Sequence, residues 1–430
     1  MKTLIKNGRL VDPSQNLDKV MDLLIEDGKI AKAADHIEEA ADEVYDATGK
    51  VVAPGFIDLH THLREPGLEA KEDLVTGTMA AAAGGITRVC CMPNTKPVID
   101  TSIVVSGIKK RAAEEGYVHV EVIGAITKGE KGKEITEMGD MAMRGAIGFS
   151  DDGHYVESSH IMLLAARYVS AFDKPLILHD IEEELNHEGY MHEGAVSARL
   201  GIPGIPSIAE DIAVARDALI AQYTGTHVHV CHIASKGAVD IVREAKKKGI
   251  PITCEATIQH LTLTDEAVSG YSTAAKISPP LRSWDHVQGL REALKDGTID
   301  AIVTDHSPHA PEEKDVEFRY APNGFCGLET SVGVALTELY HTGLFTINEL
   351  VDKMSCSPAK VYNLEGGTLK EGTNADITIL DLDKEWTVDS AKFYTRGKLT
   401  PFEGKHCQGK AVATIVDGRF VMKDGVVCKK

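Results

Sequence analysis

The feature that most constrains the fold is a repeat of apolar, β-branched segments separated by stretches with helical spacing. Eight such segments lie between residues 51 and 345: VVAPGFIDLH, ITRVCCMP, HVEVIGAI, AIGFSDD, PLILHD, HVHVCHIA, ITCEATIQH and IDAIVTDH. Residues 208–223 and 237–248, among others, carry the apolar spacing of helices. Eight strand–helix units of this total length predict a (β/α)8 (TIM) barrel of the α/β class. A doubly wound open sheet is the alternative, but it usually carries a glycine-rich turn after its first strand.

Both ends of the chain have the pattern of β structure without intervening helices. The dipeptides Asn7-Gly8 and Asp27-Gly28 interrupt apolar runs near the N-terminus, and Asp417-Gly418 and Asp424-Gly425 do so near the C-terminus. Such dipeptides are typical of hairpin turns. We therefore expect one small β-sandwich domain built from residues 1–51 and 361–430, with a catalytic barrel of residues 52–360 inserted into it.

Composition excludes several classes of protein. Hydrophobic residues are 43% and charged residues 26% of the chain, which are globular values, and the net charge of −19 disfavours nucleic acid as a partner. No apolar run reaches the roughly 18 residues of a membrane span. The N-terminus lacks the apolar core of a signal peptide, and none of the eight cysteines forms a C-x-x-C pair. These features predict a cytoplasmic protein with free thiols.

Histidines and aspartates gather where the predicted strands end. His60 and His62 are two residues apart, so on a strand both side chains point to the same face. Other strands end in Asp151, Asp152, His179, Asp180, His232, Asp305 and His306. The carboxyl ends of barrel strands form one rim, and imidazole and carboxylate are ligands that Zn²⁺ prefers. Such a set suits two metal ions bridged by a carboxylate. The competing interpretation is that these histidines make only local hydrogen bonds.

Residues 58–67, DLHTHLREPG, resemble the signature of dihydroorotases in the amidohydrolase superfamily. Further similar segments are MPNT at 92–95, FSDDG at 149–153, VCH at 230–232 and TDHSPH at 304–309. The resemblance covers about residues 1–430, because the β termini are also similar to the composite sandwich of that family. It implies a dihydroorotase of the class I, bacterial type.

The resemblance implies two zinc ions per subunit. His60, His62 and Asp305 would hold one ion, His179 and His232 would hold the other, and Asp152 would bridge them. Hydantoinases in the superfamily bridge their metals with a carboxylated lysine on the fourth strand, whereas here that strand contains no lysine. On the residues alone, Asp151 is a rival to Asp152 for the bridge.

The implied activity is the reversible interconversion of N-carbamoyl-L-aspartate and dihydroorotate in de novo pyrimidine biosynthesis, the chemistry of a hydrolase of cyclic amides. A metal-bound hydroxide would attack the ring amide, with Asp305 as general acid and base. The implied substrate contacts are Arg64, Asn94, Ser278, His309, Asn323 and Gly324. Arg64, with Asn94 and His309, would hold the substrate carboxylate, which suits a guanidinium group. Family members usually have asparagine in place of Ser278.

Several of these residues have a second interpretation. Arg64 could form a surface ion pair with Glu65 or Glu69, and His309 could be an ordinary loop histidine. The long loop of residues 310–325 is expected to cover the site. Among the other histidines, we expect His227 and His229 to pack near the ligands and His260 to be structural or close to the site. His154, His187 and His192 lie in polar loops and are expected to be solvated, whereas Cys90 and Cys91 are expected to be buried and inert.

Two other functions stay open at this stage. An allantoinase or hydantoinase would open another cyclic amide, but a neutral hydantoin ring has no use for Arg64. A metal-free scaffold, for instance for aspartate carbamoyltransferase, would be expected to have lost metal ligands, and here all six are present. A homodimer and an association with aspartate carbamoyltransferase are both compatible with an active enzyme.

Overall fold

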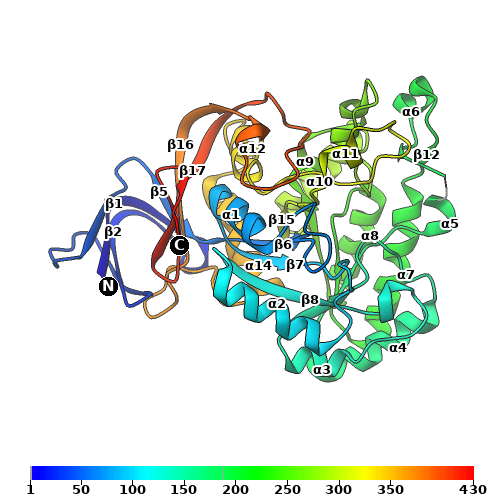
Figure 1. Ribbon diagram of the computed structural model, residues 1–430, viewed down its shortest axis with the longest axis horizontal. Helices are drawn as coiled ribbons and strands as arrows, with labels where there is room; N and C mark the ends of the chain where they lie inside the picture. The colour runs from blue at the N-terminus through cyan, green and yellow to red at the C-terminus, as the bar shows by residue number, and fades with distance from the viewer. Residues whose placement is uncertain (1, 187) are drawn as a thin grey trace.

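Eight parallel strands form a barrel in the computed structural model, which describes residues 2–186 and 188–430 (Figure 1). Its strands neighbour one another in chain order: β6 (Phe56–Thr61), β7 (Ile86–Cys91), β8 (His119–Ala125), β9 (Ala146–Ser150), β10 (Leu176–Leu178), β13 (Val228–Val230), β14 (Ile252–Thr257) and β15 (Ala301–Val303). The amide of His62 donates to the carbonyl of His306 at 2.8 Å, which joins the ends of the first and last strands. The predicted barrel is confirmed.

Helices cover the outside of the barrel between successive strands (Figure 1). The longer ones are α1 (Leu74–Gly84), α2 (Ser102–Glu115), α4 (Ser159–Val169), α7 (Ile208–Thr224), α8 (Lys236–Lys247) and α10 (Trp284–Asp296). The shorter ones are α3 (Met138–Met143), α5 (Glu183–Asn186), α6 (Ala195–Leu200), α9 (Ile258–Thr262), α11 (Pro311–Lys314), α12 (Ser331–Ala335), α13 (Ile347–Val351) and α14 (Ser357–Val361). Within the described residues, no helix combines the length and apolar character needed to cross a membrane.

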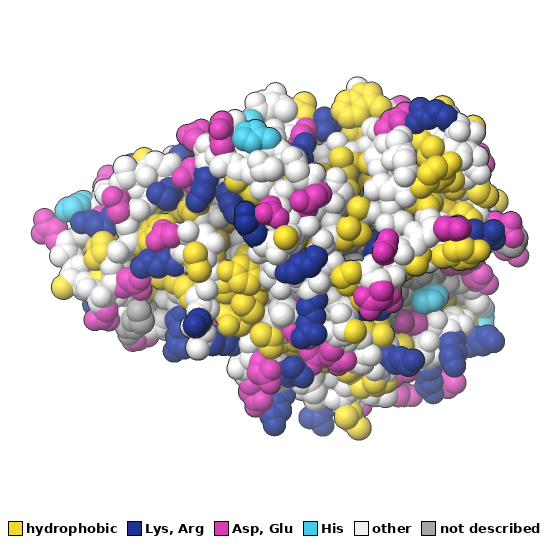
Figure 2. Space-filling model, turned by 45° about the horizontal axis from the view of Figure 1, so that its top comes forward, with side chains coloured by type: hydrophobic (Ala, Val, Ile, Leu, Met, Phe, Trp, Pro, Cys, Tyr) yellow, Lys and Arg dark blue, Asp and Glu magenta, His cyan; other side chains and the backbone are white. Residues whose placement is uncertain are grey.

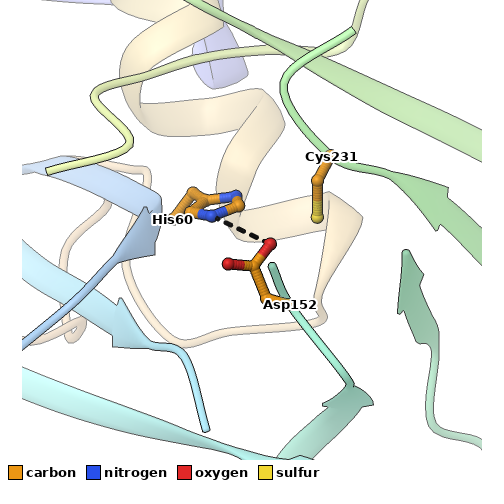
Figure 3. A group of neighbouring side chains, drawn as sticks. All are labelled: His60, Asp152 and Cys231. Atoms are coloured by element: carbon orange, nitrogen blue, oxygen red, sulfur yellow. Dashed lines mark ion pairs between the residues drawn. The ribbon is translucent and has the colours of Figure 1, made fainter. Parts of the chain in front are cut away.

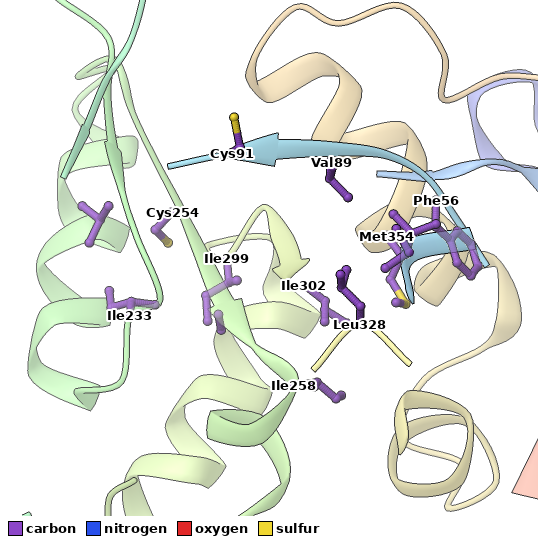
Figure 4. Close-up of a cluster of buried hydrophobic side chains, with 14 of the residues drawn as sticks. Phe56, Val89, Cys91, Ile233, Cys254, Ile258, Ile299, Ile302, Leu328 and Met354 are labelled. Carbon is purple, nitrogen blue, oxygen red and sulfur yellow. The ribbon is translucent and has the colours of Figure 1, made fainter. Parts of the chain in front are cut away.

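Alternation along the strands divides the barrel into two apolar layers. Val89 and Cys91 of β7 pack outward among residues such as Phe56 and Ile302 (Figure 4). Cys90, between them, belongs to a separate buried cluster with side chains from most of the barrel strands. This is the two-residue period of a strand that is covered on both faces. Both thiols are buried, as predicted, and burial raises the pKa of Cys91 to about 12.

Both termini contribute to a second, nine-stranded sheet at one end of the molecule (Figure 1). Its strands are β1 (Lys2–Asp12), β2 (Leu17–Glu26), β3 (Lys29–Ala34), β4 (Glu43–Asp46), β5 (Val51–Pro54), β16 (Ile377–Thr387), β17 (His406–Val416), β18 (Arg419–Lys423) and β19 (Val426–Val427). β5 pairs with both β1 and β16, so the two ends of the chain meet there. The expected β domain from both termini is confirmed, and the boundaries at residues 51/52 and 360/361 stay a proposal.

Three details of the predicted elements were wrong. Asn7-Gly8 is not a hairpin turn but lies inside β1, where the register of pairing with β2 shifts. The strand pairs with β2 on both sides of this bulge. The segment at residues 51–54 belongs to the terminal sheet, so the first barrel strand begins only at Phe56. His260 lies on α9, since β14 ends at Thr257, whose side chain caps that helix. The other three dipeptides are hairpin turns.

A short strand pair and a buried ion pair brace the loops above the barrel. β11 (Met191–His192) pairs with β12 (Gly204–Ile205). Nearby, Arg282 donates to Glu210 of α7 at 2.9 Å, and neither side chain is more than 2% exposed. The other carboxylate oxygen of Glu210 accepts from the amides of Ala234 and Ser235, just beyond β13. The pair therefore fixes the backbone that follows His232.

Replacing Arg282 with methionine is expected to lower the free energy of unfolding by about 3–5 kcal/mol, because Glu210 would keep a buried, uncompensated charge. Chemical denaturation measures the change. Arg199→Met is the matched control, since Arg199 pairs with Glu266 on the surface, where such pairs contribute about 0–1 kcal/mol. An equal loss of unfolding free energy in Arg282→Met and Arg199→Met would show that the buried pair of Arg282 and Glu210 is no more important than a surface pair.

Candidate metal centre

Six side chains meet at the carboxyl ends of five barrel strands. They are His60 and His62 from β6, Asp152 after β9, His179 after β10, His232 after β13 and Asp305 after β15. None of the six residues is more than 8% exposed. The predicted strand ends therefore converge on one buried cluster, as expected for the rim of a barrel.

The carboxylate of Asp152 lies in the middle of this cluster. Its Oδ1 is 3.4 Å from Nε2 of His60, 3.7 Å from Nδ1 of His179 and 3.6 Å from Nε2 of His232. Its Oδ2 is 3.4 Å from Nε2 of His62. One carboxylate thus contacts imidazoles from both halves of the cluster, which is the arrangement that a bridging ligand requires.

Asp151, the rival for this position, points elsewhere. Its Oδ1 accepts from the amides of Ile126 and Thr127 at 2.9 Å each, and its Oδ2 accepts from the Thr127 hydroxyl. Adjacent residues at a strand end point to opposite sides. The geometry therefore favours Asp152 over Asp151 as the residue that faces the histidines.

The two aspartates of the cluster are held in their charged forms. Burial alone would raise the pKa of Asp152, but the imidazoles of His60, His179 and His232 outweigh it and hold that pKa well below its usual range. For Asp305 burial is likewise outweighed by His62 and His60, which lower its pKa to about 2. Both groups are ionised carboxylates at neutral pH.

Two groups of ligand atoms in the cluster could each hold a metal ion. One is His60, His62 and Asp305, and the other is Asp152, His179 and His232, with the ligand atoms of each group within 4.8 Å of one another. Among the described residues, His60 Nε2 and Asp152 Oδ1 are buried and have no hydrogen-bond partner. Buried polar atoms are normally satisfied. Unsatisfied nitrogen and oxygen atoms that converge on one point fit a metal such as zinc.

Cys231 also faces the cluster from below the rim. His60, Asp152 and Cys231 form a third group with ligand spacing, and Figure 3 shows the thiol beside the carboxylate and imidazole. Burial raises the pKa of the Cys231 thiol well above its usual value. The neutral thiol is a poor ligand, so the histidine and aspartate groups are better suited to hold a metal.

Sequence reasoning missed Glu255, a residue inside β14 that fixes the orientation of His60. Glu255 Oε1 lies 2.8 Å from His60 Nδ1, and its Oε2 lies 3.1 Å from Nε2 of His229. His229 in turn contacts the hydroxyl of Thr253 at 2.8 Å. A carboxylate on Nδ1 places the proton there and leaves the Nε2 lone pair free. The alternation of β14 could have signalled an inward-facing glutamate.

Asn94 plays a similar part for His62. Its Oδ1 lies 2.8 Å from His62 Nδ1, and its Nδ2 donates to the carbonyl of Asp152 at 3.3 Å. The amide is only half-buried, so it lies at the edge of the cluster. The structure brings Asn94 to the metal ligands rather than to Arg64.

Arg64 is buried beside the cluster without a surface ion pair. Its Nε donates to the carbonyl of Pro308 at 3.2 Å, and its Nη2 lies 3.4 Å from Nε2 of His309. Glu65 pairs instead with Arg111 at 2.6 Å, and Glu69 accepts from the amide of Gly67. The alternative interpretation of Arg64 as a surface residue was therefore wrong.

His309 lies against this guanidinium, and Asn323 and Gly324 lie against His309. His309 Nε2 lies 2.8 Å from the carbonyl of Asn323. Burial, together with Arg64 and Lys71, lowers the pKa of His309 to about 3, so the ring is neutral at pH 7 and its Nε2–H donates to that carbonyl. Gly324 has a φ of +115°, and a Cβ there would lie 2.5 Å from that of Ser307. Ser278 is half-buried two residues beyond Lys276, whose carbonyl accepts from the amide of Gly324.

Backbone strain is concentrated in the same region. Arg64, His232 and Asp305 adopt φ angles of +59°, +32° and +48°. Such angles are unfavourable for residues other than glycine and persist where the surrounding structure fixes them. They often mark functional sites, and here they set the directions of two ligand side chains and of the guanidinium.

The remaining histidines divide as follows. His154 is exposed, as predicted, and His229 is packed against Glu255 behind the ligands. His192 was predicted to be solvated, which was wrong: it is buried in β11, with Nδ1 3.3 Å from the guanidinium of Arg282. His260 is buried between Thr257 and the carbonyl of Pro279. His187 lies outside the described residues.

The chain is similar to known proteins over its whole length. A family model described as dihydro-orotase-like matches residues 49–238, and one described as amidohydrolase family matches residues 329–422. The chain is 51% identical over 427 residues to a dihydroorotase from Pelotomaculum thermopropionicum, covering 99% of this chain and 100% of the relative. It is 49% identical over 426 residues to a dihydroorotase from Syntrophus aciditrophicus, with the same coverage.

Solved structures with the same fold include hydantoinases. The L-hydantoinase (dihydropyrimidinase) from Arthrobacter aurescens superposes with a TM-score of 0.90 at 27% identity, covering 100% of this chain and 97% of that one. A D-hydantoinase (dihydropyrimidinase) from Thermus sp. superposes with a TM-score of 0.83 at 25% identity, with the same coverage. The barrel and the terminal sheet are thus shared beyond the dihydroorotases.

Glu255→Gln is expected to weaken metal binding by about 10–100-fold, because an amide holds the Nδ1–H of His60 less strongly than a carboxylate does. Titration of metal-free protein with zinc against a competing chelator measures the affinity. Glu121→Gln is the control, since this carboxylate on β8 pairs with Lys109 at 3.3 Å. Unchanged affinity in Glu255→Gln would remove this residue from the support of the metal centre.

Proposed function

The chain belongs to the dihydroorotase family of the amidohydrolase superfamily, and on this premise we propose that it interconverts N-carbamoyl-L-aspartate and dihydroorotate with two zinc ions. It is an enzyme of the cyclic amidohydrolase type, and its relatives connect it with pyrimidine biosynthesis. One observation carries the choice of substrate: a buried guanidinium, Arg64, lies beside the candidate metal ligands without a carboxylate partner among the described residues. A substrate carboxylate would supply that partner.

The proposed metal ligands are His60, His62 and Asp305 for one ion and His179 and His232 for the other, with Asp152 shared between them. Bound zinc would activate a water molecule and polarise the ring amide. Glu255 and Asn94 would keep His60 and His62 in the tautomers that direct Nε2 into the cluster. The unsatisfied atoms of His60 and Asp152 support this assignment.

Asp305 is the proposed general acid and base. Its carboxylate is ionised at neutral pH, which is the form that a general base requires. Its Oδ1 accepts from the hydroxyl of Ser307 at 2.9 Å and faces both His60 and His62. This leaves Oδ2 to take up the proton and to return it to the leaving nitrogen.

Substrate binding is proposed to depend on the groups around Arg64. The guanidinium would hold the carboxylate, with His309 beside it, and Asn94 would contact the substrate from the edge of the metal ligands. The backbone of Asn323 and Gly324, together with Ser278, would contact the ring. A homodimer, an association with aspartate carbamoyltransferase and a cytoplasmic location stay predictions.

The first experiment is turnover by the purified, zinc-loaded protein of dihydroorotate, hydantoin and allantoin. We expect opening of dihydroorotate alone, abolished by a strong chelator and restored by zinc, with Asp305→Ala as the inactive control. Turnover of hydantoin in preference to dihydroorotate would overturn the proposal, and the fold shared with hydantoinases makes this comparison informative. Inactivity towards all three with zinc bound would favour a scaffold.

Arg64→Met is expected to raise KM for dihydroorotate by about 100-fold, because it removes the only proposed cation for the carboxylate. Steady-state kinetics in both directions measure the change. Arg111→Met is the matched control, since Arg111 lies on the surface and pairs with Glu65. If KM were the same in Arg64→Met as in the wild type, Arg64 would not be the carboxylate anchor.

A further inference from the structure

Two buried lysines hold one loop next to the proposed substrate site. Lys276 donates through Nζ to the carbonyls of Phe318, Arg319 and Ala321, at 2.8, 3.1 and 2.7 Å. Lys314 donates through Nζ to the carbonyls of Pro322 and Gly324, at 2.8 and 2.7 Å. We call residues 318–324 the clasped loop, since five of its carbonyl oxygens surround the two ammonium groups.

The clasped loop supplies most of the polar contacts of these lysines. Each lysine is only 5% exposed. Within residues 2–186 and 188–430, neither forms an ion pair with a carboxylate. Lys276 also lies over the rings of Tyr190 and Phe318, at 5.0 and 5.2 Å from their centroids. A buried ammonium group that lost its carbonyl partners would be strongly destabilised.

Burial opposes the charge on both groups. It lowers the pKa of Lys276 to about 8, and burial together with the neighbouring Lys276 lowers that of Lys314 to about 7. The carbonyl contacts are the interactions that favour the charged forms. The charged forms of Lys276 and Lys314 therefore depend on the conformation of the clasped loop that places its carbonyls around them.

The clasped loop reaches the proposed carboxylate site through His309. The carbonyl of Asn323 accepts from His309, which lies 3.4 Å from the guanidinium of Arg64. The amide of Gly324 donates to the carbonyl of Lys276 at 2.9 Å, so Lys276 holds the loop by its backbone as well as its side chain. Movement of residues 322–324 would release His309.

We propose that Lys276 and Lys314 are positioning residues, which hold the clasped loop so that Asn323 and Gly324 fix His309 beside Arg64. The lysines touch no reacting group themselves and act through the loop. The substrate in this proposal rests on the proposed function, whereas the effect on the loop does not.

The test compares wild-type protein with Lys276→Met and Lys314→Met, each zinc-loaded. Methionine keeps the length and apolar stem but removes the charge and all donors. Hydrogen exchange followed by mass spectrometry reports on peptides that cover residues 315–325, and steady-state kinetics report KM and kcat for dihydroorotate. We expect exchange in the clasped loop and KM each to rise by about tenfold, with a smaller change in kcat.

Lys353→Met is the matched control. Lys353 is half-buried and donates to a single backbone carbonyl, that of Ile299, which precedes β15 at the opposite end of the barrel. This variant should leave the exchange of residues 315–325 and KM at wild-type values. It controls for the general effect of removing a lysine that donates to a backbone carbonyl.

Unchanged loop exchange in folded Lys276→Met and Lys314→Met would overturn the proposal. Faster exchange without a rise in KM would also overturn it, because the lysines would then be structural only. If Lys276→Met did not fold, Lys314→Met would decide the question alone. If the wild type did not turn over dihydroorotate, the proposed function would fail, and exchange would still test whether the lysines hold the loop.

Discussion

The carboxylate of Asp152 lies among four imidazoles in a buried site, and the rest of the rim is organised around that charge. A single buried carboxylate is unfavourable unless neighbouring groups compensate it. His60, His62, His179 and His232 do so from three different strands, so the interaction depends on a closed barrel. The hydrogen bond between His62 and His306 joins the two edges of the sheet at this level. The ligands therefore come together only in the closed barrel.

Buried charges around the rim are each compensated in a different way. Glu255 lies between two imidazoles, Glu210 between Arg282 and two backbone amides, and the two lysines of the loop among carbonyl oxygens. Each arrangement fixes a segment that carries a functional side chain. Removal of one partner would leave the other uncompensated, which is costly in a buried site. The rigidity of the site thus follows from its electrostatics as much as from apolar packing.

The sequence predicted the barrel and the ligand-bearing strand ends because both depend on short-range periodicity. The choice between Asp151 and Asp152 depends on which side of the strand faces the lumen, and only the three-dimensional register decides it. Glu255 escaped prediction because its partner, His60, is 195 residues away in the chain. Asn7-Gly8 has the composition of a turn, but pairing of β1 with β2 on both sides makes it a bulge. His192 is buried for a similar long-range reason, its contact with Arg282.

The fold alone does not select the cyclic amide, since a hydantoinase shares it with a TM-score of 0.90. The difference in substrate between dihydroorotases and hydantoinases is therefore expected to come from the side chains on the rim. Arg64 is buried, and its polar contacts are a backbone carbonyl and a neutral imidazole. Neither carries the negative charge that would compensate a guanidinium in a poorly solvated site. The carboxylates of Asp305, Asp152 and Glu313 favour the charged guanidinium at longer range, but none of them forms an ion pair with it. A neutral ring would add no closer partner, whereas an anionic substrate would supply one on binding. The charges of the rim therefore favour a carboxylate-bearing substrate.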